Sequence, residues 1–193
     1  MARSKEFDEA AVLEKAMLLF LDQGYEKTSM QDLVEHMGIH RRSLYDTFGD
    51  KHALFMRSLR LYKSKVDDRL GQAALNAPSA LEGIRLVFRA MTDRAPEEPK
   101  GCLLVNTAVE LGPRDEEAER LTDESFCKLE ELLKLLIQRG QANGEIVNEL
   151  DSQATAESLH TTLLGIRVLA RTSAPKEKLL RIASVALSSL EKD

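Results

Sequence analysis

The sequence has no tryptophan, only two cysteines and few strand-forming residues. Nine valines and six isoleucines stand against 31 leucines and 20 alanines. Strong helix formers therefore dominate, and an all-α fold is favoured. Cys102 and Cys127 are too few for a disulfide framework. No apolar run approaches the roughly 18 residues of a membrane span, and the start lacks a signal-peptide pattern. We expect a cytoplasmic helical protein without a membrane partner.

The charge balance limits the kind of nucleic-acid binding that is possible. The 27 basic and 32 acidic residues give a net charge of −5, which argues against an architectural protein that coats DNA over its whole surface. A local basic patch is still compatible with this charge. The first 60 residues are close to balance, with 9 basic and 10 acidic side chains. DNA affinity would therefore depend on where the cations lie, and it would fall steeply with salt.

Aromatic residues are concentrated near the start of the chain. Seven of the nine lie within the first 62 positions, which indicates two cores of different composition and hence two domains. We predict a small domain over residues 1–55 and a larger helical domain over residues 56–193. A helix over about residues 51–70 would link them.

Apolar periodicity and capping residues predict about nine helices. Their approximate ranges are 8–23, 30–37, a third through Phe48, 51–70, 79–91, 102–111, 115–140, 151–173 and 176–190. Ser29 and Asp32 match a capping box at the second helix. Gly38 supplies the turn before the third helix, on which Leu44 and Phe48 lie four residues apart. This arrangement is a helix-turn-helix motif.

In such a motif the second helix enters the major groove with its N-terminal residues toward the base edges. These residues are His40, Arg41, Arg42 and Ser43. The planar guanidinium of arginine can donate two parallel hydrogen bonds to guanine. Phosphate contacts should come from the periphery of the motif. The candidates there are Thr28, Ser29, Gln31, Tyr45 and Lys51.

Residues 8–55 resemble the N-terminal DNA-binding domain of the TetR family of transcriptional regulators. The resemblance rests on the run of Leu33, Gly38-Ile39, Leu44-Tyr45, Phe48, Lys51 and Leu54. It implies a homodimeric regulator, most simply a repressor, that binds a palindromic operator and is released by an effector. One departure is His40, because serine or threonine is usual at this helix cap in the family.

The resemblance also implies that the last two helices form a four-helix dimer interface. The last helix is apolar almost all round, which independently indicates that a second chain covers it. The candidate interface residues on these two helices are Leu159, Leu163, Ile166, Leu180, Ala183 and Leu187.

Five residues are candidates for effector binding or sensing. Cys102 follows Lys100 and Gly101 at the predicted start of a helix, where a cation and the helix dipole favour the reactive thiolate. The alternative is a small buried hydrophobic residue. Phe88, Met91, Asn106 and Phe126 could line a pocket, or they could simply belong to the core.

No phosphate-binding glycine loop, zinc-ligand spacing or nucleophile elbow occurs in the sequence. We therefore expect no enzymatic activity, no metal and no cofactor. The expected partners are double-stranded operator DNA, a small-molecule effector of unknown identity and a second copy of the chain. The alternative is a helical ligand-binding or interaction protein without specific DNA binding.

Overall fold

The computed structural model describes residues 7–93 and 100–191. Within these ranges the chain forms nine α-helices and one short 3-10 helix, and it contains no strand. No helix in the same ranges is long and apolar enough to cross a bilayer. The elements are α1 (Glu9–Gln23), α2 (Met30–Met37), α3 (Arg41–Phe48), α4 (Lys51–Leu75), α5 (Ala80–Thr92), α6 (Leu103–Glu110), η1 (Gly112–Arg114), α7 (Glu116–Ala142), α8 (Ser152–Leu169) and α9 (Lys176–Ser188).

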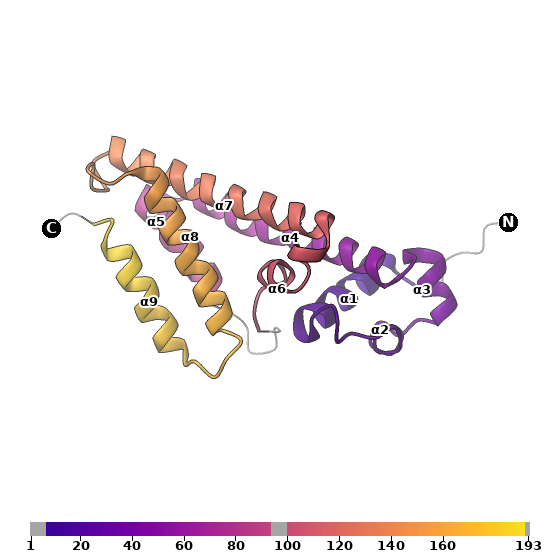
Figure 1. Cartoon of the computed structure of the whole chain (residues 1–193). Helices are drawn as coiled ribbons and strands as arrows, with labels where there is room; N and C mark the ends of the chain where they lie inside the picture. Colours follow the sequence, from indigo (N-terminus) through magenta and orange to yellow (C-terminus); the bar gives the residue numbers. More distant parts are fainter. Residues whose placement is uncertain (1–6, 94–99, 192–193) are drawn as a thin grey trace.

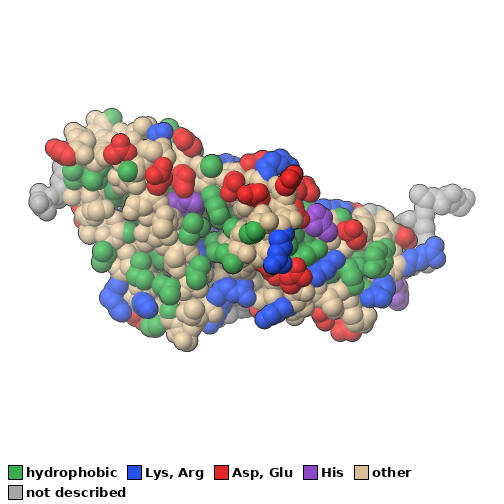
Figure 2. Space-filling view, in the orientation of Figure 1, with side chains coloured by type: hydrophobic (Ala, Val, Ile, Leu, Met, Phe, Trp, Pro, Cys, Tyr) green, Lys and Arg blue, Asp and Glu red, His purple; other side chains and the backbone are tan. Residues whose placement is uncertain are grey.

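The molecule is elongated (Figure 1). Helices α1, α2 and α3 form a small group at one end, and α4 runs from this group into the body beside α7. Helices α8 and α9 pack together at the other end, and hydrophobic side chains gather over them on the face shown in Figure 2. The predicted all-α fold is confirmed.

Two hydrophobic cores lie along this axis. The first contains the aromatic rings of the N-terminal helices, with Phe20 and Phe55 packed edge to face at 5.0 Å between ring centroids. The second is built mainly from leucine, isoleucine, valine and alanine of α4, α5, α7, α8 and α9. Helix α4 supplies Leu59 to the first core and Leu70 to the second. The uneven distribution of aromatic residues therefore corresponds to two cores of different composition.

Helix α4 extends beyond its predicted end near residue 70 and stops at Leu75. The helix continues through Gly71, which has no positive φ and no atom close to where a Cβ would lie. Leu70 and Ala74 are both buried in the second core, and this packing outweighs the helix cost of about 1 kcal/mol for one glycine.

Asp115 joins the linking helix to the body. Its carboxylate accepts hydrogen bonds from the backbone N–H groups of Glu117 and Ala118, both at 3.0 Å, and so caps α7. The other carboxylate oxygen lies 2.5 Å from Nε2 of His52 on α4. The hydrogen bond from the Ala118 N–H is the largest cause of a lowered pKa of the Asp115 carboxyl, with His52 and Glu117 adding to it.

We expect Asp115→Ala to cost about 1 kcal/mol of unfolding free energy at neutral pH, because the helix loses its N-cap. Because the pKa of Asp115 is lowered in the folded state, its ionised form stabilises the protein above the usual pKa near 4. This contribution disappears as the pH falls through the lower folded value. Denaturation curves at pH 7 and pH 3 measure the effect. An equal difference between wild type and variant at both pH values would contradict it.

Candidate DNA interface and effector cavity

The helix-turn-helix is held in place by local caps and by packing. Ser29 accepts a hydrogen bond from the Asp32 N–H at 3.1 Å, and the Asp32 carboxylate accepts one from the Ser29 N–H at 2.8 Å, so the predicted capping box is present. Gly38 ends α2 in the left-handed conformation at a φ of 71°. Leu44 and Phe48 are buried. These contacts fix α3 so that its opposite face is turned outward.

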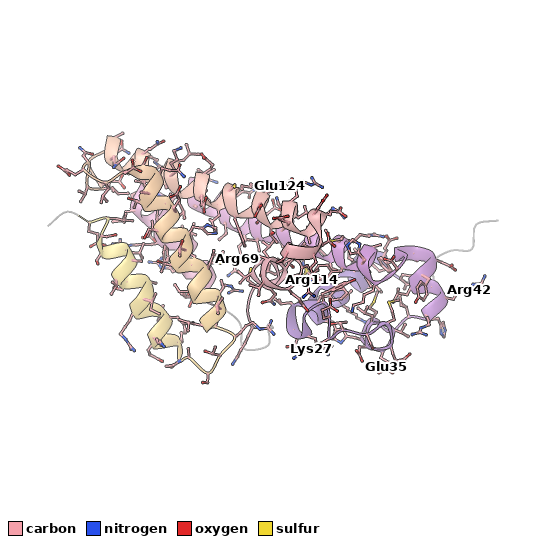
Figure 3. The ribbon with its side chains drawn as sticks, viewed as in Figure 1. Lys27, Glu35, Arg42, Arg69, Arg114 and Glu124 are labelled. Atoms are coloured by element: carbon pink, nitrogen blue, oxygen red, sulfur yellow. The ribbon has the colours of Figure 1, made fainter. Side chains whose placement is uncertain are left out.

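The outward face of α3 carries the predicted base-reading residues. His40, Arg41 and Arg42 are exposed, and Ser43 is half-buried. His40 is the N-cap residue, but its side chain makes no capping hydrogen bond. Arg42 lies at the far end of the molecule and points away from the body (Figure 3). Its 3.6 Å pair with Asp46 joins two side chains that are 93% and 70% exposed, so little energy opposes its reorientation toward DNA.

Four of the five predicted phosphate-contacting residues have solvent-accessible side chains. Ser29, Gln31 and Tyr45 are exposed, and Lys51 is half-buried. The Lys51 ammonium lies 4.4 Å from the centroid of the Tyr25 ring. The amide of Gln31 donates to Glu35 at 2.7 Å.

Thr28 is the exception, and its predicted phosphate contact is corrected here. Its side chain is fully buried, and the hydroxyl donates to the Gly24 carbonyl at 2.6 Å. Thr28 therefore stabilises the turn before α2 and presents no group to a phosphate. Because this turn follows the preceding helix closely, the hydroxyl of Thr28 reaches a local acceptor.

Arg57 positions α3, and no sequence pattern pointed to it. The guanidinium donates to the Thr47 carbonyl at 3.2 Å near the end of α3 and pairs with Glu9 of α1 at 2.5 Å. It also lies 4.7 Å from the centroid of the Phe48 ring. Thr47, Glu9 and Phe48 are 10, 48 and 9 residues away from Arg57 in sequence, so no local pattern indicates these contacts.

A cavity of about 290 Å³ lies in the C-terminal body. It is bordered by Met91, Cys102 and Phe126, three of the five residues predicted for effector binding. No sequence pattern pointed to His160, which is buried beside the cavity, or to the leucines that supply much of the cavity's apolar surface. A mostly apolar cavity with a few polar groups is typical of a small-molecule site.

The other two predicted effector residues do not border this cavity. Phe88 is buried in the second core and faces a groove between α5 and α9. Asn106 borders a surface groove between α6 and the ends of α1 and α8. Helix α5 turns Phe88 toward α9, and α6 places Asn106 on a different groove, so a ligand contact by either residue stays a prediction.

Cys102 is the N-cap residue of α6 and is 8% exposed. Its side chain makes no capping hydrogen bond. Burial raises the pKa of the Tyr62 phenol, and the neighbouring Cys102 raises it further. Cys102 therefore borders the cavity and also neighbours the Tyr62 side chain. Cys127, in contrast, is exposed on α7.

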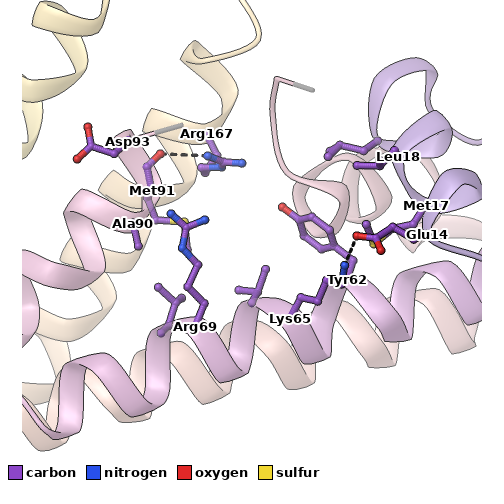
Figure 4. Close-up of a pocket in the computed structure, with 13 residues that line it drawn as sticks. Glu14, Met17, Leu18, Tyr62, Lys65, Arg69, Ala90, Met91, Asp93 and Arg167 are labelled. Atoms are coloured by element: carbon purple, nitrogen blue, oxygen red, sulfur yellow. Dashed lines mark hydrogen bonds and ion pairs between the residues drawn. The ribbon is translucent and has the colours of Figure 1, made fainter. Parts of the chain in front are cut away.

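A second hollow of about 220 Å³ lies where α1 meets the body (Figure 4). It shares Val66, Leu70 and Met91 with the first cavity. Charged side chains line much of it, and Lys65 of α4 pairs with Glu14 of α1 across its edge. These three shared residues therefore border both the apolar cavity and the hollow where α1 meets the body.

Two further contacts hold the end of α1 against the body. The Glu110 carboxylate at the end of α6 accepts the backbone N–H groups of Tyr25 and Glu26, at 3.0 and 2.8 Å. Arg171, just after α8, donates to the carbonyls of Leu21 and Asp22, both at 2.9 Å. A displacement of α6 would pull on the turn that leads into α2.

The predicted interface residues fall into two groups. Leu180 is 43% exposed, and Leu187 is half-buried. The other four lie in the protomer core, at most 6% exposed, and have almost no surface for a partner: Leu159, Leu163, Ile166 and Ala183. We therefore correct their assignment to the interface. Helices α5 and α7 already cover the side of α8 that carries Leu159, Leu163 and Ile166, and α5 and α8 cover the side of α9 that carries Ala183.

Comparison with known proteins identifies the family. Residues 12–57 match the family model described as "Bacterial regulatory proteins, tetR family", and residues 79–185 match "Tetracyclin repressor-like, C-terminal domain". The regulator YezE of Bacillus subtilis, itself uncharacterised, is 36% identical over 99% of this chain and 100% of its own length. The repressor ComR of Escherichia coli is 33% identical, over 96% and 90%.

The regulator CifR has been solved as a cysteine mutant bound to a 26-bp operator DNA. It superposes with a TM-score of 0.87 at 30% identity, over 97% of this chain and 99% of its own. The resemblance predicted from residues 8–55 is thereby confirmed, and the similarity extends over most of the remaining chain. The protein belongs to the TetR family of bacterial transcriptional regulators.

Proposed function

We propose that this protein is a homodimeric repressor that binds a palindromic operator through α3 and releases it when an effector occupies the apolar cavity. The main observation in support is the exposed basic start of α3, which packing and caps hold outward at one end of the molecule. The relative ComR is named a repressor, and CifR was solved on operator DNA. We extend both properties to this chain.

The outward face of α8 supports the homodimer. An uncharged strip follows helical spacing along this face, and its exposed members are Ser158, Thr161, Gly165, Val168 and, just past the end of α8, Thr172. The charged Glu157 is exposed beside the start of this strip. Val185 of the neighbouring α9 is 73% exposed. An uncharged, partly apolar strip of this kind favours burial against a second copy. The two recognition helices could then reach successive major grooves, about 34–36 Å apart.

The proposed release follows from the walls of the cavity. Its occupation would press on Leu104 of α6 and on Met91, which also faces the domain junction. Helix α6 is tied to the DNA-binding end through Glu110. An effector that binds the displaced conformer more tightly would therefore lower operator affinity by the ratio of its affinities for the two conformers.

Selection from a randomised DNA duplex library tests the DNA-binding proposal. We expect the bound fraction to be enriched in an inverted repeat whose half-sites are about 10 base pairs apart, or a multiple of that spacing. Affinity for the selected site should fall steeply between 50 and 200 mM salt. Enrichment of no sequence at low salt would contradict the proposal and favour a helical binding protein without specific DNA recognition.

Thiol modification is a second route to release, and Cys102 is its proposed site. In a Cys127→Ser background, N-ethylmaleimide is expected to react with Cys102 and to weaken operator binding at least tenfold, because the adduct occupies the cavity wall. The Cys102→Ser/Cys127→Ser protein is the control and should be insensitive. Mass spectrometry gives the extent of modification, and gel shift gives the affinity. Full modification of Cys102 with unchanged affinity would exclude this route.

A further inference from the structure

We propose that the cavity takes a small, flat, mostly apolar molecule, about the size of two fused rings, that donates one hydrogen bond to Nε2 of His160. This inference rests on the proposed effector role of the cavity and specifies the chemical class of the ligand. It depends on the side chains that surround the cavity and on one buried nitrogen that has no partner.

The volume and lining of the cavity set the size and polarity of the ligand. A cavity of about 150 Å³ holds one benzene molecule, so about 290 Å³ accommodates roughly two rings. Leu104, Leu129 and Leu132 supply apolar walls, and the Phe126 ring offers an aromatic surface. The charged lining residues are Asp67, Lys128 and Glu131, and Lys128 already pairs with Asp67 at 2.8 Å. Most of the remaining lining is apolar, so a ligand with several charged or polar groups would lose more hydration than it regains.

His160 provides the polar contact point. The residue is only 2% exposed, and it borders the cavity from α8. Its Nδ1 lies 2.7 Å from the carboxylate of Glu130 on α7, while Nε2 has no hydrogen-bond partner among the described residues. The Phe126 ring packs edge to face against the imidazole at 5.3 Å and holds its plane. A buried polar atom without a partner is costly, and a ligand can remove that cost.

The Glu130 contact decides which kind of ligand group fits. A carboxylate can only accept, so the imidazole donates the proton on Nδ1 to Glu130. The other nitrogen of the neutral ring then carries a lone pair and is an acceptor. The matching ligand group is a hydroxyl or an N–H. An ether or an ester of the same shape offers no donor and leaves Nε2 unpaired.

Three probes of nearly equal shape test this assignment on the full-length protein without DNA. They are 2-naphthol, which donates a hydrogen bond, 2-methoxynaphthalene, which does not, and the anion 2-naphthoate. We expect calorimetric titration to show that 2-naphthol binds about tenfold more tightly than 2-methoxynaphthalene, the value of one hydrogen bond. The anion should bind more weakly than the naphthol, because Nε2 offers it an acceptor and the Lys128 ammonium is already paired with Asp67.

Two variants assign the preference to His160. In His160→Phe the ring shape is kept and the acceptor is lost, so 2-naphthol and 2-methoxynaphthalene should bind equally. Glu130→Gln can still accept from Nδ1, so it should keep the preference. Thermal unfolding establishes that both variants are folded. Absence of binding by all three probes, tightest binding of the anion, or a naphthol preference that survives in folded His160→Phe would each overturn the proposal.

The design separates this inference from the proposed function. The two proposals have separate measurements, because probe titration is done without DNA and DNA selection is done without a probe. A wild-type protein that binds 2-naphthol through His160 but selects no DNA sequence would leave the cavity assignment intact and refute the regulator. A protein that selects an operator but shows no preference for the hydrogen-bond donor would support the regulator and refute the cavity assignment.

Discussion

Replacement of Arg41 and Arg42 together by alanine is expected to weaken binding to the selected operator at least 100-fold while the dimer stays intact. A well-placed bidentate arginine contributes about 1–3 kcal/mol of discrimination, and each dimer loses four arginines. Both side chains are exposed at the start of α3, so their truncation leaves no cavity or unpaired buried group. Gel shifts with the operator and with a scrambled duplex measure the loss of affinity and of specificity.

A matched control exists on α7. Arg120 is 64% exposed and pairs with Glu124 at i,i+4, as Arg42 pairs with Asp46 on α3. Arg120→Ala therefore removes a similar exposed ion pair away from the proposed interface, and it should leave operator affinity unchanged. The dependence of affinity on salt should become shallower only in the α3 variant, because fewer counterions are released. An α3 variant that binds like the control would refute the assigned interface.

Gly165→Arg is expected to convert the dimer to a monomer and to reduce operator affinity by about 100-fold or more. The site is exposed on α8, and no atom lies within 4 Å of a Cβ added there. An arginine therefore fits the protomer, yet it places a charge in the middle of the uncharged strip proposed to meet the partner. Loss of the linked second half-site removes the 10²–10⁴-fold gain that bivalent binding provides.

Analytical ultracentrifugation gives the oligomeric state, and thermal unfolding shows whether the protomer folds. Gly165→Ala is the control, because it adds only a methyl group and removes the helix cost of glycine. It should remain dimeric. If Gly165→Arg is still a dimer at micromolar concentration, the interface lies elsewhere on the surface.

Local sequence patterns predicted the helices well, because helix ends depend on neighbours three and four residues away. The Ser29–Asp32 capping box and the turn at Gly38 are present where the residues indicated. Cys102 is the N-cap of α6, as its position implied. The end of α4 was misplaced, because burial of Ala74 carries the helix past a glycine that a local rule takes as a stop.

The functional side chains were predicted less completely, because a residue's exposure depends on which helices meet. Thr28 has the chemistry of a phosphate contact, but its hydroxyl is already bonded to Gly24. Phe88 and Asn106 look like pocket residues in sequence, yet they face other grooves. No sequence pattern pointed to His160, because its partner Glu130 is 30 residues away on another helix.

The helical class, the helix-turn-helix and the basic start of its second helix follow from the sequence alone, since each depends on residue type and short spacing. The residues that border the cavity, the contacts that tie α6 to α1 and the uncovered face of α8 follow only from how the helices pack. These properties arise from contacts between helices distant in sequence. A periodic pattern shows that a helix has a buried side, but it does not identify the helix that covers it.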